Sequence, residues 1–261
     1  MVEHLPGKPR RGVRRGIYLL PAFFTVGNIF CGYLSLDFAL KESFVTAAAL
    51  VFAAGFLDGI DGRVARMTRT TSAFGEQLDS LADVISFGVA PSFLVYRWGL
   101  SGFDRLGLAA SFLFLVCGAC RLARFNVQAH VVDKRFFVGL PIPAAACTLS
   151  GLIWVFAEHP SEEVKAVFVG VTILLSFLMV STFRYRSFKD VDLRSRRSAI
   201  LVPIVGLVLA AGLWQPHWTF GALLVGYAVS APLAKLVSLR PFARPRPAEE
   251  IPAVPTRRPP A

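Results

Sequence analysis

Charged residues are scarce in this chain, and their scarcity excludes a soluble globular protein. Only 17% of the 261 residues are charged, whereas 54% are hydrophobic and 23 are phenylalanine. A soluble domain of this length does not need so much apolar surface to fill its core. Together with a mean hydropathy of +0.56, the composition predicts an integral membrane protein.

Cysteine and histidine are also rare, with four residues of each, and neither set is arranged as a zinc site. The single C-x-x-C, formed by Cys117 and Cys120, has no second pair and no histidine nearby. The histidines are scattered through the amino-terminal tail and the loops without metal-ligand spacing. We therefore interpret the cysteines as small packing residues within apolar segments.

Apolar stretches of roughly 16 to 25 residues dominate the chain, and that length crosses a hydrocarbon core of about 30 Å. The first is kept as a span rather than a secretory signal, because it is long, lacks a small-residue cleavage site and contains Asn28 and Asp37. We predict an all-α, polytopic membrane protein of about eight transmembrane helices, near residues 17–40, 43–62, 74–97, 106–124, 141–158, 164–182, 199–214 and 218–237.

The positions of Lys and Arg predict how these spans are oriented. With eight spans, 24 of the 28 basic residues fall on one side of the membrane, so the positive-inside rule places both termini in the cytoplasm. The net charge of +11 is spread over these loops, which favours attraction to anionic membrane lipids over nucleic-acid binding. The Pro- and Arg-rich tail at 239–261 is predicted to be disordered and suggests no specific partner.

Four aspartates interrupt the apolar segments between residues 56 and 87. An ionisable side chain in mid-span costs about 2.5–3.5 kcal/mol on insertion scales, so these acids need a partner or a function. Asp58 and Asp61 are three residues apart and Asp79 and Asp83 four apart, so each pair lies on one helix face. Counting from the basic link between the helices, Asp58 is about 13 Å deep and Asp83 about 15 Å, within the cytoplasmic half of the bilayer.

Such a group of carboxylates predicts a metal site. Neighbouring carboxylates do not all stay ionised unless a cation screens them. Ligands that are all oxygen favour Mg²⁺ or Mn²⁺, which commonly bridge carboxylates to phosphate oxygens. Gly59 and Gly62 leave bare backbone beside the acids, and Arg66 offers a forked phosphate donor. The alternative for Gly55 and Gly59 is close helix packing through G-x-x-x-G.

The whole stretch resembles the signature of the CDP-alcohol phosphatidyltransferases, D-x-x-D-G-x-x-A-R-x8-G-x3-D-x3-D, and fills each fixed position from Asp58 to Asp83. Flanking stretches resemble the integral-membrane branch of that family that uses serine: SFGVAP (86–91), GACRLARFN (118–126), GLPIPAAA (139–146) and FRYRSFK (183–189). One position departs from the pattern, because Ala22 stands where the first span of such proteins carries Asn, so any nucleotide contact from that side chain is lost.

The resemblance implies a fold and a reaction. It implies a six-helix catalytic core over residues 17–190, preceded by a cytoplasmic tail at 1–16 and followed by a helical pair at 191–238. The reaction would transfer the phosphatidyl group of CDP-diacylglycerol to L-serine, giving phosphatidylserine and CMP. Related enzymes are homodimers with one site in each subunit, so a homodimer is expected.

The resemblance also assigns roles to residues. It implies that Asp58, Asp61 and Asp79 hold the metal, and that Asp83 is the general base and a further metal contact. The CDP-diacylglycerol site would include Gly62, Ala65, Arg66, Ser72, Gly75, Thr25 and Asn28. From their place at the cytoplasmic end of the fourth span, Arg121 and Arg124 are candidates to grip the serine carboxylate, with Asn126 beside them. The alternative is that both arginines are ordinary positive-inside residues.

Two other functions are also compatible with acids at these positions. A different acceptor, such as glycerol 3-phosphate, inositol phosphate or choline, would keep the same Asp, Gly and Arg core. A divalent-cation transporter would also explain acids within the membrane, but the sequence has no inverted repeat and no pair of broken helices. The Ala65-Arg66 and glycine positions would then lack a purpose.

Overall fold

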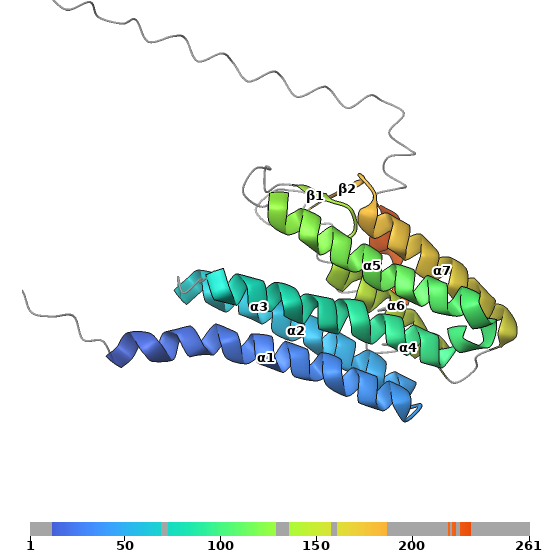
Figure 1. Ribbon diagram of the computed structural model, residues 1–261, viewed down its shortest axis with the longest axis horizontal. Helices are drawn as coiled ribbons and strands as arrows, with labels where there is room; N and C mark the ends of the chain where they lie inside the picture. Colours follow the sequence, from blue (N-terminus) through green and yellow to red (C-terminus); the bar gives the residue numbers. More distant parts are fainter. Residues whose placement is uncertain are drawn as a thin grey trace, which may run out of the picture.

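The computed structural model describes residues 12–68, 73–128, 136–157, 161–186, 219, 221–222 and 225–230. The described part of the chain is a bundle of long helices lying side by side (Figure 1). The helices are α1 (Gly12–Leu40), α2 (Phe44–Thr68), α3 (Ala73–Asp83), α4 (Ala90–Trp98), α5 (Asp104–Gln128), α6 (Ile142–Phe156) and α7 (Glu162–Val180). Short π- and 3₁₀-helices, η1 (Val84–Val89) and η2 (Leu100–Phe103), flank α4.

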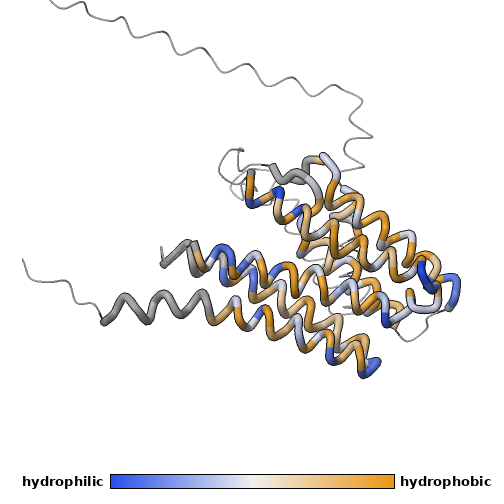
Figure 2. Tube along the Cα trace, viewed as in Figure 1, coloured by the Kyte–Doolittle hydropathy of each residue, from blue (hydrophilic) through white to orange (hydrophobic). Residues whose placement is uncertain are grey.

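The helices have the length and composition of membrane spans. Five segments are long and apolar enough to cross a bilayer: Phe23–Leu40, Phe44–Asp61, Phe74–Trp98, Leu100–Val127 and Glu162–Val180. Helix α6 is apolar but shorter. Figure 2 shows hydrophobic residues along most of each helix, with strongly hydrophilic ones toward the helix ends. The prediction of a helical, polytopic membrane protein is therefore confirmed.

The predicted number of eight spans is not established. The first six predicted spans correspond to α1, α2, the α3–α4 rod, α5, α6 and α7. The predicted span at 199–214, and both terminal tails, lie outside the described residues. Of the predicted span at 218–237, residues 219, 221–222 and 225–230 are described, and they are helical.

The third span changes its helical type immediately after Asp83. Helix α3 ends at Asp83, and the chain continues as the π-helix Val84–Val89 before α4 begins. Ser86, Phe87 and Gly88 of this segment are buried, and the Ser86 hydroxyl donates a hydrogen bond to the Asn28 backbone carbonyl at 2.9 Å. A π-helical turn within an α-helical rod is frequent at functional sites. Here it fixes how the last turn of α3 meets α1.

Gly32 allows α1 to approach this π-helical turn. A Cβ at position 32 would lie 2.6 Å from Ser86 Oγ and 2.9 Å from Ser86 Cα, closer than atoms can pack. We expect Gly32→Ala to lower the free energy of unfolding by about 1–3 kcal/mol, because α1 must move away from the backbone of η1. The loss of stability is measured as a lower midpoint of thermal unfolding in detergent.

Gly170→Ala is the matched control for that substitution. Gly170 lies within α7, and a Cβ there would meet no described atom within 4 Å. Alanine is the better helix former by about 0.5–1 kcal/mol, so this variant should be at least as stable as the parent. Equal midpoints for the two variants would contradict the close approach of α1 to η1.

A small antiparallel ribbon closes one end of the bundle, and the sequence did not predict it. Strand β1 (Phe136–Val138) pairs with β2 (Arg184–Arg186), with Phe137 opposite Tyr185. Gly139 follows β1 with φ +79°, a left-handed conformation that favours glycine. A Cβ there would lie 2.3 Å from the Met179 carbonyl oxygen. The ribbon therefore ties the start of α6 to the end of α7.

Candidate active site

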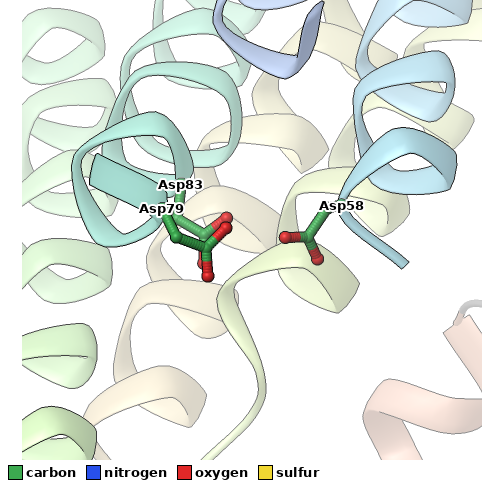
Figure 3. Close-up of side chains that lie close together, drawn as sticks. All are labelled: Asp58, Asp79 and Asp83. Carbon is green, nitrogen blue, oxygen red and sulfur yellow. The ribbon is translucent and has the colours of Figure 1, made fainter. Parts of the chain in front are cut away.

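Three carboxylates from two helices converge within the bundle. Asp58 projects from α2, and Asp79 and Asp83 project from α3 with their carboxylates next to each other and facing Asp58 (Figure 3). One carboxylate oxygen from each of the three lies within 4.8 Å of the others. We call Asp58, Asp79 and Asp83 the carboxylate cluster. The i, i+4 spacing on α3 explains why its two acids point the same way.

Asp61 lies beside the carboxylate cluster but has a partner of its own. Its side chain is 5% exposed and accepts a hydrogen bond from the Thr25 hydroxyl of α1. Asp61 and Asp58 both act electrostatically on Asp79, so all four predicted acids belong to one charged site. Thr25, which the sequence placed at the CDP-diacylglycerol site, orients one of those acids in the structure.

The donor set fits a divalent cation. The cluster offers oxygen atoms alone, which is the preference of Mg²⁺ and Mn²⁺. Asp83 Oδ1 is buried and has no hydrogen-bond partner among the described residues, a state that costs free energy unless something binds there. Carboxylates this close repel each other unless a cation or a proton lies between them. Asp58, Asp79 and Asp83 could therefore hold a divalent cation together, with Asp61 adjacent.

The hydrogen bond from Thr25 leads to a prediction about metal affinity. Thr25→Val removes the hydroxyl that orients Asp61 while keeping the shape of the side chain. Partners that orient acids at metal sites change metal affinity by about 10–100-fold when they are removed. We expect the Mg²⁺ or Mn²⁺ concentration for half-maximal activity to rise about tenfold, as measured by metal titration.

Thr25→Ser is the control, because serine keeps the hydroxyl and should titrate like the parent protein. If the valine and serine variants had the same metal dependence as the parent, the bond from Thr25 to Asp61 would have no part in metal binding.

Arg121 is buried next to the cluster. Its side chain lies on α5 at 6% exposure, and it interacts electrostatically with Asp83. The guanidinium lies 5.5 Å from the centre of the Phe125 ring, and Nε has no hydrogen-bond partner among the described residues. A buried arginine with a free N–H beside a carboxylate cluster is suited to bind an anionic group.

The structure separates the other two residues predicted to bind serine from this position. Arg124 Nη1 donates a hydrogen bond to the Val180 carbonyl at 3.0 Å, at the end of α7. Asn126 is exposed, and its Nδ2 donates to Ser80 Oγ at 2.9 Å. Both contacts connect α5 to a neighbouring helix. Of the three predicted residues, Arg121 alone is buried.

The predicted nucleotide-site residues are described to different extents. Gly62, Ala65 and Arg66 lie in the last turns of α2, Gly75 lies in the first turn of α3, and Ser72 lies outside the described residues. Asn28 is fully buried, and neither its side-chain oxygen nor its nitrogen has a hydrogen-bond partner among the described residues. An amide left unpaired in the interior marks a place where a ligand or water can bind.

The two glycines of the G-x-x-x-G stretch have different surroundings. A Cβ at Gly55 would lie 3.6 Å from Cys147 Sγ, an ordinary packing contact with α6. At Gly59, one turn later and next to Asp58, an added Cβ would meet no described atom within 4 Å. Helix packing therefore explains Gly55, whereas Gly59 leaves open space beside the carboxylate cluster.

Comparison with known proteins decides the family. The family model described as CDP-alcohol phosphatidyltransferase matches residues 18–182, which include the cluster, Asp61 and Arg121. The chain belongs to the CDP-alcohol phosphatidyltransferase family. The resemblance stated from the motif is confirmed, and the cluster lies at the positions that the family signature specifies.

Several members of the CDP-alcohol phosphatidyltransferase family are similar to this chain, among them three proteins named CDP-diacylglycerol–serine O-phosphatidyltransferase. The protein from Helicobacter pylori strain J99 is 45% identical over 197 residues, covering 74% of this chain and 82% of the relative. The Bacillus subtilis protein is 35% identical over 170 residues, covering 65% and 91%. The Methanocaldococcus jannaschii protein is 36% identical over 177 residues, covering 67% and 78%.

Proposed function

We propose that this protein transfers the phosphatidyl group of CDP-diacylglycerol to L-serine, releasing phosphatidylserine and CMP. The observation that carries the proposal is the cluster of Asp58, Asp79 and Asp83 with the buried Arg121 beside it. It is supported by family membership and by the names of relatives up to 45% identical. Family membership also argues against the cation-transporter alternative.

The aspartates would hold the cation that the diphosphate requires. Asp58, Asp61 and Asp79 are the proposed ligands, and Asp83 is a further contact. A bound Mg²⁺ or Mn²⁺ would supply positive charge to the diphosphate and to the departing CMP. The acids themselves fix that charge at one position, and Thr25 keeps Asp61 in place through its hydrogen bond.

Asp83 is proposed as the general base. The serine hydroxyl oxygen attacks the phosphorus that carries diacylglycerol, and the bond from that phosphorus to the bridging diphosphate oxygen breaks. The hydroxyl proton goes to a carboxylate oxygen of Asp83, and CMP leaves with the electrons of the broken bond. Oδ1 of Asp83 has no partner among the described residues, so it is free to receive this proton.

Arg121 is proposed to select the acceptor by its carboxylate. Serine differs from glycerol 3-phosphate, inositol phosphate and choline in carrying a carboxylate next to its amine. The planar guanidinium of Arg121 can bind such a group with two parallel N–H bonds. Because Arg121 interacts electrostatically with Asp83, serine bound to this guanidinium would lie on the side of the proposed base. Asn126 and Arg124 remain predicted contributors, although each bonds to a neighbouring helix.

The nucleotide would lie on the open side of α2. Gly62, Ala65, Arg66, Ser72 and Gly75 are proposed to line the CDP site, together with Thr25 and Asn28 of α1. The open space at Gly59 and the unpaired amide of Asn28 support a ligand between these helices.

By the distribution of basic residues, both termini and the active site would lie toward the cytoplasm. We also propose a homodimer.

An acceptor panel tests the proposed function. The purified protein in detergent, supplied with CDP-diacylglycerol and Mg²⁺ or Mn²⁺, is offered serine, glycerol 3-phosphate, inositol phosphate or choline, and CMP release is measured. We expect release with serine alone. Release with a different acceptor alone would leave the family reaction intact and refute serine as the substrate. The absence of release with all four would refute the proposed activity.

A further inference from the structure

One turn of α1 is hydrogen-bonded to both of the helical segments that carry the acids. The Thr25 hydroxyl donates to Asp61 of α2. Three residues later, the Asn28 backbone carbonyl accepts a hydrogen bond from the Ser86 hydroxyl of η1 at 2.9 Å. Thr25 is 4% exposed, and Asn28 and Ser86 are fully buried. Residues three positions apart lie on one face of a helix, so this face of α1 connects an acid of α2 to the segment that follows α3.

The Asn28 carbonyl is open to Ser86 because the residue one turn later is glycine. Within α1 this carbonyl is directed toward the backbone N–H of Gly32, and its oxygen has a second lone pair that can accept from Ser86. A Cβ at position 32 would lie 2.6 Å from Ser86 Oγ. A side chain there would therefore occupy the space of the hydroxyl. Gly32 and Ser86 together allow a direct contact between α1 and η1.

Ser86 is well placed to fix the α3 acids relative to α1. It lies in the π-helical turn that begins directly after Asp83, and Asp79 is one turn before Asp83 on α3. Apolar packing tolerates small sliding and rotation of a helix, whereas a hydrogen bond restricts its donor to a narrow range of distance and angle. The bond from Ser86 therefore specifies one position of this segment against α1.

We propose that Ser86 is a positioning residue for the cation site, acting through α1; this inference rests on the metal site of the proposed function. Its bond to the Asn28 carbonyl fixes α1 along and about its axis. Thr25, one turn away, then places its hydroxyl on Asp61 and keeps that acid beside the carboxylate cluster. Metal ligands are commonly oriented by groups that do not themselves touch the metal.

Direct binding of Mn²⁺, without substrates, tests this role. Ser86→Ala removes the hydroxyl and adds no bulk. Loss of one hydrogen bond corresponds to about a fivefold change in an equilibrium constant, so we expect the Mn²⁺ dissociation constant to rise about fivefold. It is measured in detergent from the electron paramagnetic resonance signal of free Mn²⁺. Gly32→Ala separates the same two groups from the side of α1 and should weaken binding as well. Binding like that of the parent in either variant would overturn the proposal.

Ser92→Ala is the matched control. Ser92 lies on α4, which follows η1, and is 6% exposed. Its hydroxyl donates to the Val89 carbonyl at 2.9 Å, three residues earlier in the chain. This variant also loses a buried hydroxyl but no contact with α1, so its Mn²⁺ dissociation constant should match that of the parent. An equal rise in Ser86→Ala and Ser92→Ala would indicate general loosening and overturn the role of Ser86.

A double substitution tests whether Ser86 acts through Thr25. Thr25→Val already removes the hydroxyl that orients Asp61, so adding Ser86→Ala should raise the Mn²⁺ dissociation constant little further. If the two effects multiplied in full, Ser86 would influence the cation by a route other than Thr25, and the proposal would be wrong.

Mn²⁺ binding and CMP release together tell apart failure of this inference and failure of the proposed function. If the parent binds Mn²⁺ and releases CMP with serine, while Ser86→Ala binds Mn²⁺ equally well, the inference alone is wrong. If the parent binds no Mn²⁺ and releases CMP without a divalent cation, the metal site of the proposed function is wrong, and the role of Ser86 falls with it.

Discussion

Replacing Asp83 by asparagine is expected to lower kcat for CMP release about 10³-fold, because a positioned general base contributes about 10²–10⁴-fold to a rate. The amide keeps the size of the side chain but cannot accept the serine proton. Asp83 lies among like charges, with Asp58 and Asp79 both acting on it. Removing one of these charges relieves repulsion, so the thermal midpoint should be unchanged or higher.

The metal dependence of Asp83→Asn distinguishes a base from a metal ligand. If the carboxylate mainly removes the proton, raising Mg²⁺ or Mn²⁺ to saturation will not restore the rate. Asp37→Asn is a matched control, because Asp37 is a carboxylate on α1 that pairs with Lys41 at 2.5 Å and takes no part in the cluster. An Asp83→Asn variant retaining more than about a tenth of the parent rate would contradict the assignment of the base.

Metal removal should abolish CMP release, and Asp58→Asn should raise the metal concentration that half-maximal activity requires. A chelator is expected to stop CMP release, and added Mg²⁺ or Mn²⁺ to restore it. Asp58 is the α2 member of the cluster, so its loss leaves Asp79 and Asp83 of α3, with the adjacent Asp61 as the one remaining α2 acid of the site. We expect the half-saturating metal concentration to rise by at least about 10–100-fold, the range seen when even an indirect metal contact is lost.

Thermal unfolding provides a second measure of metal binding that does not depend on catalysis. A cation that binds the folded state stabilises it by about 2.7 kcal/mol at 100 times its dissociation constant. The parent should therefore show a higher midpoint with metal, and Asp58→Asn should lose most of that shift. Excess metal should recover part of the Asp58→Asn rate. A chelated parent that still released CMP at the full rate would rule out the cation site.

The sequence predicted that Asp58, Asp79 and Asp83 lie together, as the structure shows, because the spacing that brings the acids together is local. Asp79 and Asp83 are separated by four residues, and one helical turn places them on one face wherever the helix packs. Helices α2 and α3 are consecutive and run in opposite directions (Figure 1), so the short link between them brings Asp58 opposite the two α3 acids (Figure 3). The lengths of the hydrophobic stretches likewise predicted six of the helical segments. A segment in lipid forms a helix because its backbone N–H and C=O groups must then hydrogen-bond within the segment.

Contacts between distant segments required the tertiary structure. Three polar residues near the end of α5 were predicted to serve one ligand, but helix rotation points them to different neighbours. Arg121 is buried beside Asp83, Arg124 bonds to Val180, and Asn126 bonds to Ser80. Residues two to five positions apart on a helix differ by up to about half a turn in direction, so sequence proximity does not decide which one faces the site.

The amino-acid sequence by itself determined that this is a helical membrane protein with a carboxylate site of a known family, because composition, span length and motif spacing are properties of short segments. The tertiary structure decided which groups surround that site: Thr25 on Asp61, the π-helical turn after Asp83, and the buried Arg121 of α5. The hydrogen bond from Thr25 to Asp61 joins residues 36 positions apart, and the bond from Arg124 to Val180 joins residues 56 positions apart. They depend on how whole helices rotate and pack, which no local pattern specifies.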